Sequence, residues 1–152
     1  MMTAAVLGFI VKDNQVLLAM KKRSFGKGWW NGYGGKIEAG ESPLEAVLRE
    51  TREEIGVVLK DPIHHGTLHF FFEDGQTPDW EVQVFRAEDF DGEPAETEEM
   101  APQWFSVEEV PYDSMWKDDP HWLPLLLAGK RFDGKFTFRD NTTLIAHEVR
   151  EL

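Results

Sequence analysis

The segment that most constrains this chain is residues 34–57, GGKIEAGESPLEAVLRETREEIGV, because it joins a glycine turn to a helix whose two ends are both marked. Ser42 suits the N-cap, Pro43 suits the first helical position, and Glu45 completes a Ser-x-x-Glu capping box. Gly56 suits the left-handed turn that commonly follows a helix. The segment therefore predicts a loop followed by a helix that begins at Pro43 and ends before Gly56.

The predicted helix has an apolar stripe and an acidic side. At about 100° per residue, the stripe that we expect to pack on the core contains Leu44, Val47, Leu48, Thr51 and Ile55. The acidic side carries the carboxylates of Glu50, Glu53 and Glu54, with the small Ala46 beside them, which leaves room for a ligand. Because like charges at i, i+3 and i+4 repel one another, a cation is expected there.

A hard divalent ion such as magnesium suits this all-oxygen set, because it retains waters and shares substrate phosphates. Arg49 can also reach Glu53 at i+4. The alternative is a solvated acidic face, which is the ordinary role of charged helix surfaces. The glycine turn and the spacing of the glutamates favour the metal site.

The spacing of these residues resembles a known signature. From Gly35 it reads glycine, five residues, Glu41, seven residues, then Arg49-Glu50-x-x-Glu53-Glu54-x-Gly56-Val57. This long pattern is similar to the box of the Nudix hydrolases, which cleave nucleoside diphosphates linked to another group. The resemblance implies an α+β Nudix fold, in which a mixed β-sheet is sandwiched between helices and residues 35–57 form the loop and helix beside it. Thr51 stands where the family usually has an aliphatic residue, and we expect its hydroxyl to bond back to a helix carbonyl.

Composition limits the remaining possibilities. At 152 residues the chain is predicted to be a single domain, residues 1–152. The formal net charge of −12 argues against a nucleic-acid polymer as partner. The lack of cysteine excludes disulfides and thiolate metal sites. We find no apolar run of membrane-spanning length and no signal peptide, so a cytoplasmic monomer without membrane contact is expected.

Outside the box, most elements are predicted to be strands. We expect hairpins or strand pairs from residues 4–11 with 16–20, 66–73 with 80–88, and 132–138 with 142–149, and further strands near 29–31 and 103–107. Residues 107–110 are predicted to form one helical turn, 121–128 a helix closed by Gly129, and 89–100 an acidic stretch of turns. Because helices and strands do not alternate, a doubly wound parallel sheet is not expected.

Four further segments narrow the resemblance: KKRSFGKGWWNGYGGK, TEEMAPQWF, MWKDDPHWLPLLL and KRFDGKFTF. They are similar to the mammalian-type oxidized purine nucleoside triphosphatases, which hydrolyse 8-oxo-dGTP and 2-hydroxy-dATP to monophosphate and pyrophosphate and so sanitise the nucleotide pool. The resemblance implies that Asn31, Asp118 and Asp119 read the base, that Trp116 stacks on it, and that Lys21 lies on the phosphate side. The implied pocket walls are Phe25, Phe70, Phe72, Trp80, Met100, Trp122 and Phe138.

Three positions depart from the mammalian sequences. Val6 replaces a hydroxyl residue, Trp80 a smaller apolar residue, and Lys117 a proline. These departures bear on base preference rather than on the type of reaction.

The base-reading residues have a physical rationale. Two neighbouring carboxylates in a closed site cannot easily both stay ionised, so one of Asp118 and Asp119 should hold a proton near neutral pH. Moving that proton would let one pocket match the edges of oxidised guanine and oxidised adenine. Alternatively, the two aspartates cap the helix that begins near His121, and both roles are compatible.

The metal ligands are expected to be Glu50, Glu53, Glu54 and the Gly35 carbonyl, and the family resemblance adds Glu99. The expected ion is Mg²⁺, with Mn²⁺ as a substitute. Glu53 or Glu54 would act as the base for water, and Arg49 would orient Glu53.

Three alternative functions compete with this one. One is a Nudix enzyme acting on ordinary or other modified nucleotides, a dinucleotide or an RNA 5′ end. Another is a nucleotide-binding module without catalysis, which the intact glutamates oppose. The third, an isomerase on an allylic diphosphate, would need a cysteine, and the chain has none.

Overall fold

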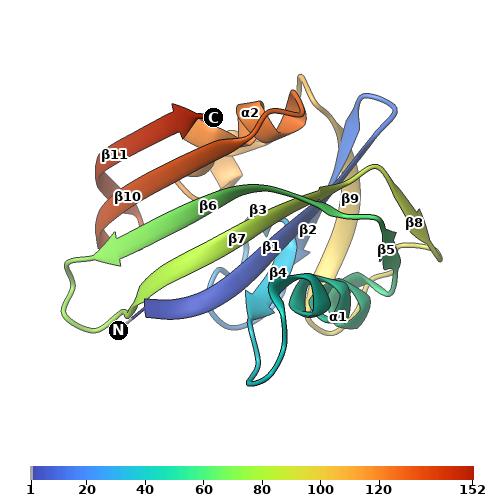
Figure 1. The fold of residues 1–152 in the computed structure, drawn as a ribbon, viewed down its shortest axis with the longest axis horizontal. Coiled ribbons are helices and arrows are strands. Elements are labelled where there is room, and N and C mark those ends of the chain that lie inside the picture. The colour runs from blue at the N-terminus through green and yellow to red at the C-terminus, as the bar shows by residue number, and fades with distance from the viewer. Residues whose placement is uncertain (1) are drawn as a thin grey trace.

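The computed structural model describes residues 2–152 and shows a curved mixed sheet with helices on its two sides (Figure 1). The strand order is β11-β10-β6-β7-β1-β2-β3, with β4 paired to β1 and β9 to β2. The strands of this sheet are β1 (Met2–Lys12), β2 (Gln15–Lys21), β3 (Trp30–Asn31), β4 (Tyr33–Lys36), β6 (Ile63–Phe72), β7 (Asp79–Ala87), β9 (Met100–Ser106), β10 (Phe132–Asp140) and β11 (Thr143–Glu151). The helices are α1 (Pro43–Ile55), the 3-10 helix η1 (Tyr112–Ser114) and α2 (Asp119–Leu127).

The sheet is mixed because antiparallel hairpins are joined through parallel contacts. β1 runs antiparallel to β2, β6 to β7, and β10 to β11, as predicted from the sequence. β1 is parallel to β7 and β10 is parallel to β6. The predicted α+β class with a mixed sheet between helices is therefore confirmed.

Both ends of α1 follow from local chemistry. The Ser42 hydroxyl accepts from the Glu45 amide at 3.1 Å, and Glu45 Oε1 accepts from the Ser42 amide at 3.0 Å. Gly56 is left-handed, with φ 76°, and its N–H donates to the Arg52 carbonyl. The capping box and the glycine stop are confirmed, and they set where the acidic helix begins and ends.

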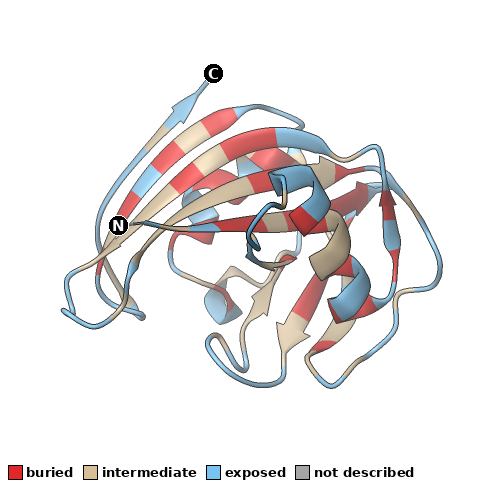
Figure 2. Cartoon of the chain, turned by 60° about the horizontal axis from the view of Figure 1, so that its bottom comes forward, coloured by how far each residue is buried: buried red, intermediate tan, exposed pale blue. Residues whose placement is uncertain are grey.

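Apolar side chains fill both sides of the sheet. β1 and β2 each contain four consecutive buried residues, because both faces of the sheet are covered there, whereas buried and less buried positions alternate along β10 (Figure 2). On one side, Val47 and Ile55 of α1 pack with Tyr33 and Phe85. On the other side, the buried residues of α2 pack against aromatic side chains of β1 and β10; this second cluster includes Trp122, Leu123, Leu126, Phe9, Phe132, Phe136 and Phe138.

The buried side of α1 differs from the predicted stripe. Leu44 is 44% exposed, whereas Ala46 is fully buried in the core and leaves no room for a ligand, so both expectations were wrong. The buried residues are Ala46, Val47, Thr51, Glu54 and Ile55. The helix is rotated because the Glu54 carboxylate accepts from the Gly34 amide of β4 at 2.9 Å, which holds that side of the helix against the sheet.

Thr51 also departs from its prediction. Its side chain is fully buried, and within residues 2–152 its hydroxyl has no hydrogen-bond partner. The expected bond to a helix carbonyl is therefore wrong. The hydroxyl faces the close contact between α1 and β1, where a Cβ added at Gly8 would lie 2.9 Å from Val47 and 3.6 Å from Thr51 Oγ1.

The structure differs from the predicted elements at three further places. Residues 107–110 form a turn rather than helix, and η1 follows at Tyr112–Ser114, after Pro111. The acidic stretch begins with β8 (Asp89–Asp91), which pairs with β5 (Val58–Lys60) in a separate two-stranded sheet. α2 begins two residues before the predicted start, which places Asp119 inside it.

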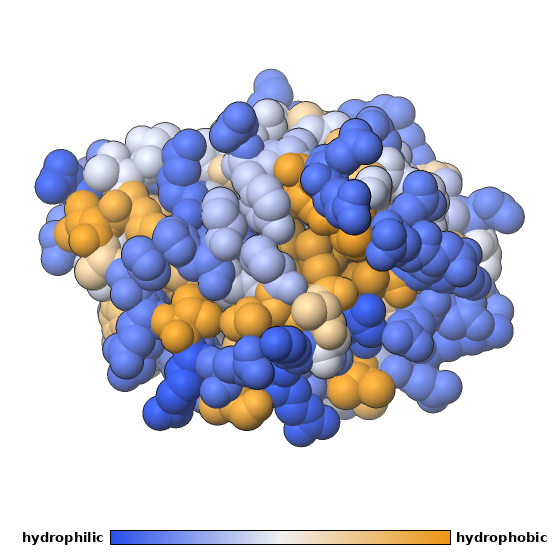
Figure 3. Space-filling model, turned by 90° about the horizontal axis from the view of Figure 1, so that it is seen from above, coloured by the Kyte–Doolittle hydropathy of each residue, from blue (hydrophilic) through white to orange (hydrophobic). Residues whose placement is uncertain are grey.

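The surface is largely hydrophilic on the face drawn in Figure 3, where hydrophobic patches are separated by polar side chains. Neither α1 nor α2, nor any other helix in residues 2–152, combines the length and apolarity needed to cross a membrane.

Candidate active site

One cavity collects every residue that the sequence assigned to substrate binding. It lies between β1, β6, β7 and the segment that precedes α2, and it reaches Gly34 and Gly35 of β4. The predicted residues that line it are Lys21, Phe25, Asn31, Phe70, Phe72, Trp80, Met100, Trp116, Asp118, Asp119, Trp122 and Phe138. Val6 lines it as well.

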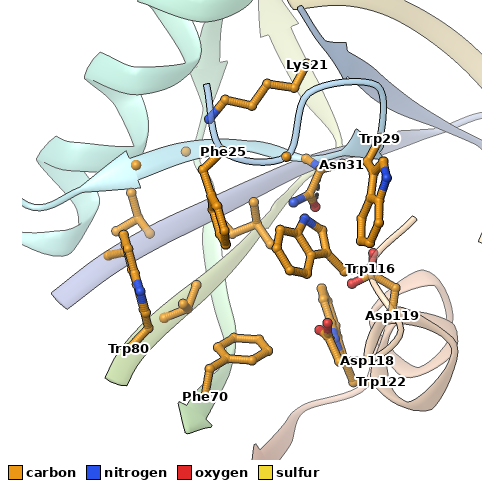
Figure 4. A pocket seen from close by; sticks show the side chains of 18 of the residues that line it. Lys21, Phe25, Trp29, Asn31, Phe70, Trp80, Trp116, Asp118, Asp119 and Trp122 are labelled. Atoms are coloured by element: carbon orange, nitrogen blue, oxygen red, sulfur yellow. Dashed lines mark hydrogen bonds between the residues drawn. The ribbon is translucent and has the colours of Figure 1, made fainter. Parts of the chain in front are cut away.

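Trp116 is surrounded by other aromatic rings. Its ring centroid lies 4.9 Å from that of Phe25 and 4.8 Å from that of Trp29, and Phe138 meets it edge-on at 6.3 Å. Figure 4 shows Trp116 between Phe25 and Trp29, with Asn31 nearby. Trp29 was not singled out in the sequence, although its place in a glycine-rich segment beside the box was a usable signal. These contacts hold the indole in one orientation, as a stacking surface requires.

The two aspartates at the start of α2 are buried together. Asp118 and Asp119 are 3% and 2% exposed. Asp118 Oδ2 accepts from the Trp122 indole N–H at 2.8 Å, whereas Asp119 Oδ2 has no partner within residues 2–152. Asp118 occupies the N-cap position, but its side chain makes no capping hydrogen bond. The capping role considered from the sequence is therefore absent for Asp118.

Burial changes the acidity of both carboxyl groups. Loss of solvation raises the pKa of Asp118 to about 6. Loss of solvation also raises the pKa of Asp119 well above its usual range, and the charge of Asp118 and a hydrogen bond between the two groups add to this effect. The pair therefore favours holding at least one proton near neutral pH, so that it can offer one donor and one acceptor to the cavity.

Asn31 contributes an amide to the same cavity. Its Oδ1 accepts from the Gly32 amide at 2.8 Å, which turns the NH₂ group away from that backbone contact. The side chain therefore has donors left for a ligand.

The carboxylates of α1 lie where the cavity meets the glycine turn. Glu54 is 3% exposed, and burial, together with the charges of Glu50 and Glu99, raises its pKa to about 8 despite the bond from Gly34. The Glu50 carboxylate lies against Gly35, where an added Cβ would come within 2.8 Å of it. Burial raises the pKa of Glu50 too. Glycine at position 35 thus makes space for this carboxylate.

Arg49 organises the exposed edge of this carboxylate group. It donates to both oxygens of Glu41, from Nε at 2.7 Å and from Nη2 at 2.9 Å. Nη1 lies 2.7 Å from Glu50 Oε1 and 3.3 Å from Glu53 Oε2. Arg49 therefore contacts Glu53, as expected, but holds Glu50 more closely. Glu41 belonged to the recognised spacing without an assigned role, and its hydrogen bonds with Arg49 lower its pKa to about 2.

The oxygen donors of this group are of the kind that a hard divalent cation prefers. Glu50, Glu54 and Gly35 lie together, and the charge of Glu99 reaches Glu50 and Glu54. Burial is the main cause of the raised pKa of Glu54, and a cation would relieve the repulsion from Glu50 and Glu99 that adds to it. Arg49 holds Glu50 and Glu53, and Arg23 lies 3.4 Å from Glu99. Within residues 2–152 no three His, Cys, Asp or Glu side chains converge on one point.

This combination of fold, box and carboxylates defines a class of protein. The chain matches the NUDIX domain over residues 1–126, and it belongs to the Nudix hydrolase family. The resemblance seen in residues 35–57 is thus confirmed. Nudix hydrolases generally use a divalent metal ion.

Individual relatives extend over nearly the whole chain. It is 44% identical over 147 residues to the oxidized purine nucleoside triphosphate hydrolase of Danio rerio, covering 96% of this chain and 93% of the relative. The enzyme of the same name from Mus musculus is 42% identical over the same coverage. Among solved structures, a mutator MutT protein from Bacillus halodurans superposes with a TM-score of 0.87 at 31% identity, with 97% of each chain covered. The predicted Nudix fold and the narrower resemblance are both confirmed.

Proposed function

We propose that this protein hydrolyses oxidised purine (deoxy)nucleoside triphosphates, such as 8-oxo-dGTP and 2-hydroxy-dATP, to the monophosphate and pyrophosphate with Mg²⁺. The observation that carries the proposal is one cavity with two chemically different ends. The buried pair Asp118 and Asp119 lies at one end, and Gly34 and Gly35 lie at the other, beside the carboxylates of α1. In the cytoplasm, this activity would remove oxidised purine nucleotides from the nucleotide pool.

Base selection is assigned to the aromatic and acidic end. The Trp116 ring offers a face on which a purine can stack. Asn31 donates from its amide, protonated Asp119 donates, and ionised Asp118 accepts. Transfer of the proton from Asp119 to Asp118 exchanges the donor and the acceptor, so one pocket suits the hydrogen-bonding edges of two different oxidised purines.

The reaction is assigned to the glycine and glutamate end. We assign Glu50, Glu53, Glu54 and the Gly35 carbonyl, with Glu99, as the ligands of Mg²⁺, and Mn²⁺ as a substitute ion. When bound, the ion would neutralise phosphate charge and lower the pKa of a bound water. Glu53 or Glu54 accepts the proton of the attacking water, and Arg49 keeps Glu50 and Glu53 in place. Lys21, which lines the cavity, would face the phosphates.

The names of the Danio rerio and Mus musculus relatives support this assignment. A second candidate, a Nudix enzyme for another nucleotide, is favoured by Trp80. Its indole lines the cavity, and the Lys36 ammonium lies 5.9 Å from the ring, so the mouth carries a bulky cation–aromatic pair.

A direct test measures pyrophosphate release with Mg²⁺ from 8-oxo-dGTP, 2-hydroxy-dATP, dGTP and a dinucleoside polyphosphate. A site built to hydrogen-bond one base edge is expected to favour an oxidised purine over dGTP, by up to about 10⁴-fold. Equal rates on 8-oxo-dGTP and dGTP would reject oxidised-base selection. Tight binding of 8-oxo-dGTP without pyrophosphate release would instead show a nucleotide-binding module.

A further inference from the structure

Thr97 makes several hydrogen bonds between α1 and the strand β9, although the sequence assigned it no role beyond its place at the start of the segment TEEMAPQWF. It lies in the acidic loop, defined here as residues 93–99, which ends at Glu99. Its hydroxyl donates to the Glu54 carbonyl at 2.8 Å and lies 3.2 Å from the amides of Glu99 and Met100. Its own amide donates to the Met100 carbonyl at 2.9 Å. One hydroxyl thus joins the helix of Glu54 to the backbone that carries Glu99.

Lys22 connects the same loop by hydrogen bonds to the segment that packs on Trp116. The Lys22 ammonium donates to the Thr97 carbonyl at 2.8 Å and to the Glu96 carboxylate, and its amide donates to the Glu99 carbonyl at 2.8 Å. Lys22 begins the base loop, residues 22–29, whose Phe25 and Trp29 pack on Trp116. A continuous set of contacts therefore runs from Trp116 to the backbone of α1 at Glu54.

We propose that Thr97 is a positioning residue that fixes Glu99 relative to Glu54, and that Lys22 extends this connection to the base loop. Metal binding at Glu99 would order the acidic loop, and base binding against Trp116 would order the base loop. Because Lys22 joins the two loops, each binding event then supports the other. The inference rests on the proposed function. It assigns Thr97 and Lys22 no contact with substrate or metal.

A hydroxyl is required at this position because it donates and accepts at once. Thr97→Val keeps the shape and removes all three hydrogen bonds of the hydroxyl, whereas Thr97→Ser keeps the hydroxyl that makes them. Thr142→Val is the matched control, because the Thr142 hydroxyl bonds to Asp140 at 2.9 Å in the turn between β10 and β11. Lys22→Met removes the ammonium and keeps the length of the side chain.

Two measurements avoid turnover. Mn²⁺ is titrated into each protein without nucleotide, and the bound ion is followed by electron paramagnetic resonance. Binding of 8-oxo-dGMP is followed by tryptophan fluorescence, first with a chelator and then at saturating Mg²⁺. A third measurement is the Mg²⁺ concentration that gives half-maximal hydrolysis of 8-oxo-dGTP.

Thr97→Val is expected to weaken Mn²⁺ binding about tenfold and to raise the half-maximal Mg²⁺ concentration by a similar factor, the size expected for lost hydrogen bonds. Thr97→Ser and Thr142→Val should stay within about twofold of the unaltered protein. Mg²⁺ should strengthen 8-oxo-dGMP binding to the unaltered protein, and Lys22→Met should lose this gain while binding without metal stays unchanged.

The inference is wrong if Thr97→Val binds Mn²⁺ as well as the unaltered protein, or if Thr97→Ser binds it as weakly as Thr97→Val. It is also wrong if Mg²⁺ strengthens 8-oxo-dGMP binding in Lys22→Met as much as in the unaltered protein. An equal loss of metal-free 8-oxo-dGMP binding in Thr97→Val would show a general structural role instead. If the unaltered protein fails to hydrolyse 8-oxo-dGTP, the proposed function fails, whereas the Mn²⁺ titration still tests the role of Thr97.

Discussion

Arg49 and Glu41 form a two-point ion pair, in which Nε and Nη2 of the guanidinium each donate to one carboxylate oxygen, at 2.7 and 2.9 Å. The remaining nitrogen, Nη1, is thereby directed at Glu50, 2.7 Å away. Glu41 thus acts on Glu50, a proposed metal ligand, from eight residues before Arg49, through one planar cation.

Arg49→Lys should lower kcat/KM for 8-oxo-dGTP by about 10- to 100-fold, the usual loss when a residue that orients metal ligands is changed. Lysine keeps the charge but cannot bind Glu41 at two points and Glu50 at the same time. Steady-state kinetics with Mg²⁺ measure the effect, and Arg52→Lys in the last turn of α1 is the control. A variant of Arg49 as active as that control would contradict the assigned role.

Glu53→Gln should keep the fold and abolish turnover, because an amide neither takes a proton from water nor binds Mg²⁺ as a carboxylate does. The side chain of Glu53 is 57% exposed, so its replacement should leave the melting temperature nearly unchanged. Circular dichroism and pyrophosphate release check the two parts. A near-normal rate would remove Glu53 from the mechanism.

The preference between 8-oxo-dGTP and 2-hydroxy-dATP should change with pH, because the shared proton of Asp118 and Asp119 decides which groups donate. The ratio of kcat/KM for the two nucleotides, measured from about pH 5 to about pH 9, checks this. Asp119→Asn fixes a donor at that position and should flatten the profile. An unchanging preference in the unaltered protein would count against the proton transfer.

The aspartate pair should also make stability depend on pH. Folding raises the pKa of Asp118 from 3.8 to about 6, so across that interval the folded state binds more protons than the unfolded state. The free energy of unfolding therefore falls as the pH rises from about 4 to about 6. Asp118→Asn should remove much of this slope, whereas Glu109→Gln, an exposed carboxylate, should retain it. Urea unfolding at several pH values measures both; equal slopes would contradict the assignment.

Trp80→Met should raise KM for 8-oxo-dGTP by about two- to fivefold with little change in kcat. The loss corresponds to the cation–aromatic contact with Lys36 and to contact area at the mouth of the cavity, which bind substrate and transition state alike. The same substitution should change the ratio of activities on different purines. A fall in kcat at constant KM would show that Trp80 acts on the chemical step instead.

The sequence predicted the elements whose causes are local. The ends of α1 follow from Ser42, Glu45 and Gly56, and the hairpins follow from alternating apolar residues between turns. The cavity members came from a family resemblance rather than from periodicity. That resemblance placed Phe25 and Phe138, which are far apart in the chain, in one pocket.

The errors arose from contacts between distant segments. A helical wheel cannot show that Gly34 bonds to Glu54, and this bond rotates α1 so that Ala46 is buried and Leu44 is exposed. β8 was missed because it is short, acidic and paired with β5. The link through Thr97 joins α1 to a loop more than forty residues away, and its hydroxyl carries no periodic signal.

The final hairpin has a consequence for how such proteins diverge. The family match ends at residue 126, whereas Phe138 stands on β10, beyond that point, and is fully buried at the wall of the cavity. Part of the cavity wall that we assign to base selection therefore comes from a strand beyond the residues that match the NUDIX domain. Under the proposed function, substitutions in this hairpin would reshape one wall of the purine pocket without replacing any of the proposed metal ligands, so nucleotide preference could change while the hydrolytic residues are kept.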